Sequence, residues 1–266
     1  IEEEFLNNLE YCPSCQSNVH LERFGGSGDG VVWRCVNNGC RWFGSIRRGS
    51  FFAHSNLSVL DQFRLIIAFV ADSTVSSTAK MHGVARSSVT EYFIECRQMY
   101  DAALLNDPIT FDEAGEFEID ELQIKQVALA PNVHAEVWVQ SILERRSGRL
   151  YLHRIQDRTR PEMVPPIQQL VPADSVVFTD EHRSYGNLGT LGYHHATVNH
   201  SAGEYQRWGN VAGLRRSIHI NTCEGVNSLI RRRLAYKARR TIGYIDLILS
   251  ELMYRNSGRS LFDPFK

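Results

Sequence analysis

The sequence contains no long apolar run and no large excess of charge of either sign. A helix that spans a membrane needs about 20 predominantly apolar residues, and the 266-residue chain has no such run. The first residues, IEEEFLNNLEY, lack the basic and apolar regions of a secretory signal, so we expect an intracellular protein with no membrane partner. The net charge of −1 does not decide for or against nucleic acid, because it averages over local differences.

Those local differences in charge are large. The segment from Glu113 to Glu121 is acidic, whereas the segment from Arg215 to Arg240 is rich in Arg and Lys and contains Glu224 as its single acid. A lone Glu among arginines is most often a salt-bridge partner on a solvated helix face. The alternative is that Glu224 meets carboxylates that are distant in the sequence.

Four of the six cysteines form two close pairs, CPSC and CVNNGC, which are separated by the Gly-rich, hairpin-like stretch FGGSGDGVVW. This spacing is typical of a zinc ribbon, in which four thiolates hold a structural Zn²⁺ in a tetrahedron. Two disulfides in a secreted domain are the less favoured alternative, because no secretory signal is present. The predicted zinc ligands are Cys12, Cys15, Cys35 and Cys40.

The zinc ribbon is expected over residues 1–50, a length that needs the metal for its folding energy. His20 and His54 could each replace a ligand, but a complete set of cysteines makes both surface histidines. Cys96 and Cys223 have no close partner and are expected to be buried. Several side chains of this module suit contact with DNA phosphates and bases: Trp33, Arg34, Arg41, Trp42, Arg47 and Arg48.

A helical domain is expected over residues 51–106. Within it, the segment 74–100 predicts a short helix, a turn at a glycine, and a second helix with Ser87 or Ser88 as its N-cap. This order matches a helix-turn-helix motif, and the preceding zinc ribbon favours DNA binding over the alternative of an ordinary αα-hairpin. The residues expected to face a DNA groove are Arg86, Ser87, Ser88 and Thr90.

A third domain is expected over residues 107–266, where apolar and polar residues begin to alternate in the way that is typical of strands. Three strands should form an antiparallel meander, and a helix over residues 160–171 should follow. The apolar run SVVFT then predicts a buried parallel strand that ends at Asp180, followed by a helix, a further strand, an irregular stretch and a final helix. The five strands are expected at 115–124, 137–145, 149–155, 175–180 and 194–200.

This order of elements predicts an α/β ribonuclease H-like domain with a mixed sheet. Asp120 in the first strand and Asp180 in the fourth would then lie side by side. Glu224 would approach them from the final helix, with Asn221 and Thr222 as possible caps of that helix. Three carboxylates repel one another unless a cation lies between them. Two Mg²⁺ ions, with Mn²⁺ as a substitute, suit oxygen ligands and phosphodiester chemistry.

Other charged and polar residues near these acids have simpler expected roles. Glu121 points to the opposite face of its strand from Asp120, so we expect a surface charge and not a fourth ligand. The histidines at 194, 195 and 200 are expected to lie at a strand end near DNA, in preference to a second zinc site. Basic residues that follow Glu224 are expected to clamp phosphates: Arg231, Arg232 and Arg233.

Four blocks of sequence resemble one known family. These blocks are EIDEL (118–122), FTDEHRSY (178–185), GYHHATVNHSAGEY (192–205) and HINTCEG (219–225). Together they resemble the DDE transposases of the IS1595 (ISXO2-like) and Merlin group, over most of the chain from Cys12 to Asn256. The chain departs from the group in two places: residues 121–138 lack a basic, glycine-containing stretch, and Asn227 stands where the group has a Trp.

The resemblance implies a catalytic triad of Asp120, Asp180 and Glu224, which binds the Mg²⁺ ions. Four other positions match the group and would orient the triad or the scissile phosphate: Asn199, His200, His219 and Asn221. The implied function is cut-and-paste DNA transposition, in which terminal inverted repeats are bound, cleaved and joined to target DNA. Because two ends of double-stranded DNA must meet, a homodimer or a higher homo-oligomer is implied.

Two alternatives to an active transposase remain open at this point. A domesticated transposase would keep sequence-specific DNA binding without catalysis. A structure-directed nuclease on the same fold, such as a junction resolvase, would cut branched DNA. The C-terminal segment ELMYRN resembles the Merlin branch, which implies a nuclear protein, whereas membership of the other branch implies the bacterial cytoplasm.

Overall fold

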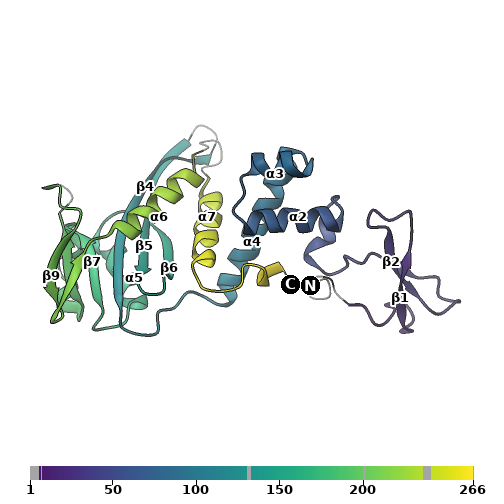
Figure 1. Cartoon of the computed structure of the whole chain (residues 1–266), viewed down its shortest axis with the longest axis horizontal. Coiled ribbons are helices and arrows are strands. Elements are labelled where there is room, and N and C mark those ends of the chain that lie inside the picture. Colours follow the sequence, from purple (N-terminus) through teal and green to yellow (C-terminus); the bar gives the residue numbers. More distant parts are fainter. Residues whose placement is uncertain (1–5, 7, 131–132, 200–201, 236–240, 266) are drawn as a thin grey trace. The chain divides into compact units, whose positions relative to one another are not determined.

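The chain folds into two compact units, which we describe separately. The structure is a computed structural model that describes residues 6, 8–130, 133–199, 202–235 and 241–265. One unit comprises residues 1–99 with 260–266, and the other comprises residues 100–259. The boundary between them falls inside helix α4 (Arg86–Asn106). Figure 1 colours the chain from its N-terminus to its C-terminus and labels most of its helices and strands.

The first unit begins with a small antiparallel sheet in the order β1-β2-β3. Its strands are β1 (Val19–Arg23), β2 (Val31–Cys35) and β3 (Phe43–Gly44). The Gly-rich stretch connects β1 to β2, so the expected hairpin is present. Arg47 and Asp29 form a largely buried ion pair with an N–O distance of 2.5 Å. That pair ties the loop after β1 to the segment that leads into the helices.

Three helices follow in this unit: α2 (Val59–Val70), α3 (Val75–His82) and the first part of α4. The predicted turn is present, and Gly83 ends α3 in the left-handed conformation (φ 66°) that glycine adopts without a steric penalty. The expected caps of α4 are wrong. The carbonyl of Ala85 already accepts the amide of Val89, so Ser87 and Ser88 lie inside the first turn.

The second unit is built on a five-stranded mixed sheet in the order β6-β5-β4-β7-β8. Its first three strands form the predicted antiparallel meander, whereas β7 pairs in parallel with β4 and with β8. The mixed sheet with helices beside it is therefore confirmed. The strands are β4 (Glu116–Ala130), β5 (Val133–Glu144), β6 (Leu150–Ile155), β7 (Val176–Asp180) and β8 (His194–Val198).

Helices cover both faces of this sheet. Helices α6 (Asn221–Arg233) and α7 (Ile242–Arg255) pack on one face, where an apolar cluster joins them to β4, β5 and β6 (Figure 1). Helix α5 (Arg160–Leu170) contacts the other face, where the carboxamide of Gln140 donates to the carbonyl of Met163 (3.0 Å). The core of the unit therefore lies in two layers, one on each side of β4 and β5.

Two connections differ from the expected ones. Between β7 and β8 the structure has two short 3₁₀ turns, η2 (Arg183–Tyr185) and η3 (Leu188–Leu191), where a helix was predicted. Glycines at 186, 189 and 192 disfavour a longer helix there. The stretch predicted to be irregular contains an antiparallel hairpin of β9 (Arg207–Val211) and β10 (Leu214–Ile218).

Candidate active site and metal centre

Asp120 and Asp180 lie on adjacent parallel strands. The register of β4 and β7 pairs Glu118 with Phe178, and two residues further along each strand come Asp120 and Asp180. Because side chains alternate between the faces of a sheet, both aspartates lie at the same level and on the same face as Glu118. This is the face that α6 covers.

The start of α6 is fixed to β4 by a buried carboxylate. The Oε2 atom of Glu118 accepts hydrogen bonds from the backbone amides of Thr222 (2.8 Å) and Cys223 (3.1 Å). A carboxylate in this place satisfies unpaired amides at the helix N-terminus and complements the helix dipole. The predicted caps Asn221 and Thr222 are therefore wrong: Ile220 occupies the N-cap position without a side-chain hydrogen bond.

The charge of Glu118 is balanced by Arg145 of the segment that follows β5. The Nε atom of Arg145 donates to Glu118 (2.9 Å), and its two terminal nitrogens donate to the carbonyls of Ser217 (2.9 Å) and His219 (2.7 Å). The guanidinium carbon lies 3.9 Å from the ring centroid of Phe178. Arg145 therefore holds the chain between β10 and α6 against the sheet.

His219 lies beside this ion pair. Its Nδ1 atom is 3.2 Å from Glu118, and only 22% of its side chain is exposed. Burial, followed by the charge of Arg145, lowers the pKa of His219, while Glu118 partly opposes that shift. The side chain is thus part of the support beneath the start of α6.

Helix α6 also contacts Asp120 directly. The carboxamide of the buried residue Asn227 donates to Oδ2 of Asp120 (2.7 Å), and Ser141 of β5 donates to Asn227 (3.3 Å). Glu224 precedes Asn227 by three residues, so helical periodicity places both on the same side of α6. The structure therefore brings Glu224 to the side of the sheet that carries Asp120 and Asp180.

Glu121 was predicted to be a surface charge, but its carboxylate is buried. Its side chain is fully buried on the opposite face, where Arg158 donates from two nitrogens (2.9 and 2.7 Å) and the Tyr185 hydroxyl also donates. Burial raises the pKa of Glu121 to about 8, and Arg158 partly opposes that shift. The prediction was wrong because α5 and η2 cover this face. Arg158 also contacts Asp180 (3.2 Å), which links the buried carboxylate to the site.

Not all of the residues of the first unit that were expected to contact DNA are exposed. Arg86 and Ser87 are exposed at the start of α4, and Ser88 and Thr90 are half-buried. Arg48 is exposed. The prediction that Arg47 contacts DNA is wrong, because its guanidinium donates to Asp29 and to the carbonyl of Ser55 inside the unit.

The arginines expected to clamp phosphates lie in the last turn of α6. Arg231 and Arg232 are exposed in the last turn of α6, about 10 Å along the helix axis from Glu224 at 1.5 Å per residue. The guanidinium of Arg233 forms an ion pair with Glu251 of α7 (3.4 Å). The contact of these arginines with phosphates stays a prediction, because Arg231 and Arg232 are exposed on the helix that carries Glu224.

Two other positions that match the family, Asn199 and Asn221, lie directly after β8 and at the start of α6. Asn199 accepts the amide of Ala202 (2.8 Å) and shapes the turn after β8, while Asn221 is exposed. His200 lies outside the described residues. His195 forms a hydrogen bond with the hydroxyl of Thr179 (2.9 Å), and His194 is exposed. Within the described residues, no histidines gather into a second metal-binding cluster beside the cysteine cluster.

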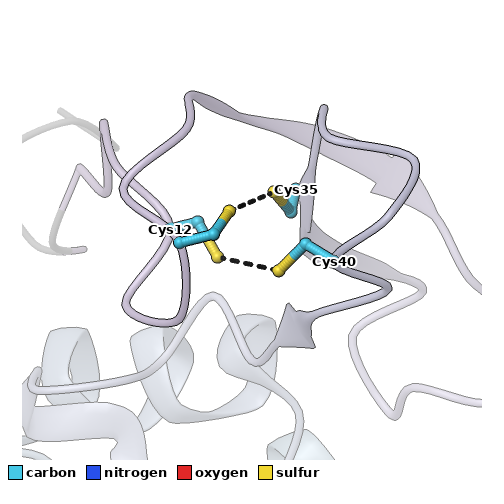
Figure 2. A group of neighbouring side chains, drawn as sticks. Cys12, Cys35 and Cys40 are labelled. Carbon is cyan, nitrogen blue, oxygen red and sulfur yellow. Dashed lines mark hydrogen bonds between the residues drawn. The ribbon is translucent and has the colours of Figure 1, made fainter.

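The four cysteines of the first unit form a compact cluster. Their sulfur atoms all lie within 4.8 Å of one another, and none of the six cysteines forms a disulfide. Figure 2 shows the sulfur atoms of Cys35 and Cys40 facing the loop that carries Cys12. The sulfur–sulfur distances are 3.7 Å for Cys12 with Cys40 and 3.5 Å for Cys15 with Cys35.

These distances fit a tetrahedral zinc site. Zinc–sulfur bonds of about 2.3 Å give sulfur–sulfur edges of about 3.8 Å, whereas a disulfide needs about 2.05 Å. Hydrogen bonds from Ser17 lower the pKa of Cys15 to about 6, while burial raises the pKa of Cys35 to about 12. Zn²⁺ would stabilise all four thiolates together. As expected, Cys96 and Cys223 are buried and His20 and His54 are exposed.

The triad carboxylates form no comparable cluster. Among the described residues, the cysteines are the one group of three or more ligand atoms that already lie together at metal-binding distance. The chemistry of the triad nevertheless fits a hard cation, because Asp120, Asp180 and Glu224 offer oxygen ligands alone.

Comparisons with known proteins point to one family. The sequence model of the ISXO2-like transposase domain matches residues 115–257, whereas a search of curated proteins finds no match. Within the described residues, no helix has the length and apolarity to cross a bilayer.

Several solved structures are similar at low identity. One is a chain in the simian T-cell lymphotropic virus intasome bound to the PP2A regulatory subunit B56 gamma, at 11% identity and a TM-score of 0.34, covering 70% of this chain and 66% of that one. A chain of the Mos1 pre-cleavage transpososome has 9% identity and a TM-score of 0.24, covering 77% and 79%. A chain of the Mos1 strand transfer complex has 10% identity and a TM-score of 0.26, covering 77% and 78%.

Proposed function

The chain belongs to the ISXO2-like transposase family, and from this premise we propose that it cuts DNA at the ends of a transposable element and joins them to target DNA. The observation that carries this proposal is the placement of Asp120 and Asp180 at one level of adjacent parallel strands, with α6 anchored beside them. The sheet order β6-β5-β4-β7-β8 supports a ribonuclease H-like fold for this unit.

Asp120, Asp180 and Glu224 would together hold two Mg²⁺ or Mn²⁺ ions. Such ions, when bound, activate the attacking oxygen and stabilise the oxygen that leaves phosphorus. The chain supplies the geometry around them. Asn227 fixes one oxygen of Asp120, and Arg158 holds Asp180.

Glu118 sets the position of the helix that carries Glu224. Because Glu118 and Arg145 are buried beneath α6, they would act as positioning residues that do not touch DNA. A catalytic group must be held close to its productive geometry, so these contacts should matter for the rate.

The first unit would recognise the terminal inverted repeats. The cysteine cluster would hold a structural Zn²⁺, and α3, Gly83 and α4 would form a helix-turn-helix. The exposed residues Arg86 and Ser87 at the start of α4 support this proposal, because the first residues of a recognition helix reach the base edges. A homodimer or higher homo-oligomer would bring two DNA ends together.

The test is a strand cleavage and joining assay in Mg²⁺. Labelled duplexes carry either the element's own terminal repeats or scrambled repeats, a branched DNA junction is a third substrate, and Glu224→Gln serves as the inactive variant. Cleavage at the repeat boundary, followed by joining and lost in Glu224→Gln, is the expected result.

Two other results would each contradict the proposal. Repeat-specific binding without cutting by either protein would favour a domesticated DNA-binding protein. Equal cleavage of scrambled repeats and of branched DNA would favour a structure-directed nuclease.

A further inference from the structure

The β9–β10 hairpin covers β7 and β8 on the face that carries Asp180. Its inward residues Val211 and Ile218 are buried in an apolar cluster with Phe178 and Ala196. Cross-strand partners share a face, and successive residues alternate between faces. The pairs Trp208 with Ser217 and Asn210 with Arg215 therefore point outward. We call these four residues the outer hairpin face.

The outer hairpin face combines an aromatic ring with positive charge. Trp208 is 61% exposed, and the guanidinium carbon of Arg215 lies 5.6 Å from its ring centroid. The hairpin contains three arginines and no acidic residue.

Arg207 pairs with Glu204 and Arg216 pairs with Glu116, but no carboxylate in the described part of the chain pairs with Arg215. A free guanidinium beside a large exposed ring complements an anionic partner that also has flat apolar faces.

Each end of the hairpin lies next to an element that is close to a triad residue. At its start, the guanidinium of Arg207 donates to the carbonyl of Thr197 (3.0 and 3.3 Å). Thr197 precedes Val198, which is the register partner of Asp180. At its end, β10 runs into the start of α6, which carries Glu224. The start of β9, with Trp208 one residue after Arg207, therefore lies near the end of β8 that is next to Asp180.

We propose that the outer hairpin face binds DNA beside the phosphate that is cut, with Trp208 stacked on an unpaired base and Arg215 on a phosphate. This inference rests on the proposed function. Every base has a face that can stack on an indole ring, and an arginine that contacts a phosphate adds affinity that salt weakens. An unpaired base fits better than an intact duplex, because stacked base pairs leave no base face free for Trp208.

The test uses the whole chain with its zinc and without added Mg²⁺, with a fluorescein-labelled dT oligonucleotide and a mixed-sequence duplex as probes. Loss of a stacked base from Trp208→Ala should weaken binding of the single strand roughly tenfold, while Trp208→Phe should retain most of the affinity. Arg215→Ala should lower the slope of log affinity against log salt by about 0.7. Arg154→Ala removes an exposed arginine of β6, the edge strand on the other side of the sheet from β8, and should change neither quantity.

A local signal separates this surface from other DNA contacts of the chain. Tryptophan fluorescence of the wild type should be quenched by unlabelled dT oligonucleotide, and Trp208→Phe should lose most of that quenching. Equal quenching in both proteins, or no binding of the single strand by the wild type, would overturn the proposal. Quenching at Trp208 in a protein that cuts no DNA would refute the proposed function and leave this surface standing. If the wild type cleaves DNA normally and Trp208→Ala binds the single strand as the wild type does, the proposed function stands and the proposal for this surface is refuted.

Discussion

The substitution Glu118→Gln tests whether a buried carboxylate holds the helix of the active site. The wild-type side chain is fully buried and accepts two backbone amides of α6, the Thr222 hydroxyl and the guanidinium of Arg145. Glutamine removes the charge and turns one acceptor into a donor that faces other donors. Loss of one partner from a buried ion pair costs about 3–5 kcal/mol.

The matched control is Glu116→Gln on the same strand. Glu116 also bonds to Arg145, but 38% of its side chain is exposed, so its loss should cost only about 0–1 kcal/mol. For a unit of 160 residues (100–259), a loss of about 3 kcal/mol corresponds to a fall in melting temperature of roughly 6–12 °C.

Thermal unfolding followed by circular dichroism measures the difference between the two variants. Glu118→Gln should also lose strand cleavage at temperatures where it remains folded, because Glu224 is no longer held in place. Equal melting temperatures for the two variants would refute the role of Glu118 as the anchor of α6.

Three further predictions concern other contacts of the site and the cysteine cluster. Asn227→Leu removes the donor to Asp120 and should lower the cleavage rate more than it changes DNA affinity, which single-turnover kinetics and a binding titration separate. Glu121 has its pKa raised from 4.5 to about 8, so its contribution to stability is present below pH 4.5 and is lost as pH rises through 8. Glu121→Gln should therefore flatten the decline of the urea midpoint across this range when no Mg²⁺ is added, and an unchanged slope would contradict the burial of that carboxylate. Cys35→Ser should reduce bound zinc from about one ion per chain and lower the first melting transition, whereas Cys96→Ser, which lies outside the cluster, should keep the zinc.

Local patterns were sufficient to predict many elements of this fold. Close pairs of cysteines on either side of a glycine-rich turn predicted the cluster, because each pair has to reverse the chain within a few residues. Alternating apolar residues located the three antiparallel strands, and an apolar run that ends at Asp180 located β7. From the strand order follows the proximity of Asp120 to Asp180.

The contacts that support the site could not be predicted, because their partners are distant in the sequence. Glu118 caps a helix that begins more than 100 residues later, and a single sequence gives no signal for such a pair. Glu121 was assigned to the surface because alternation gives the face of a strand but not what covers that face.

The β9–β10 hairpin was missed for two local reasons. Its turn is Ala212-Gly213, with φ of 50° and 74°, and lacks the Asn-Gly signal that is typical of such turns. Its inward face also includes Gly209 and Arg216, which breaks the apolar alternation of a half-buried strand.

The central claim is that Asp120, Asp180 and Glu224 act as one metal-dependent site for DNA cleavage. The most direct measurement compares cleavage of element ends in Mg²⁺ by Asp120→Asn, Asp180→Asn, Glu224→Gln and the control Glu181→Gln, which changes an exposed acid next to Asp180. The account predicts that each triad variant binds the ends normally but does not cut them, while Glu181→Gln cuts as the wild type does. Cleavage by Glu224→Gln at the wild-type rate would contradict it.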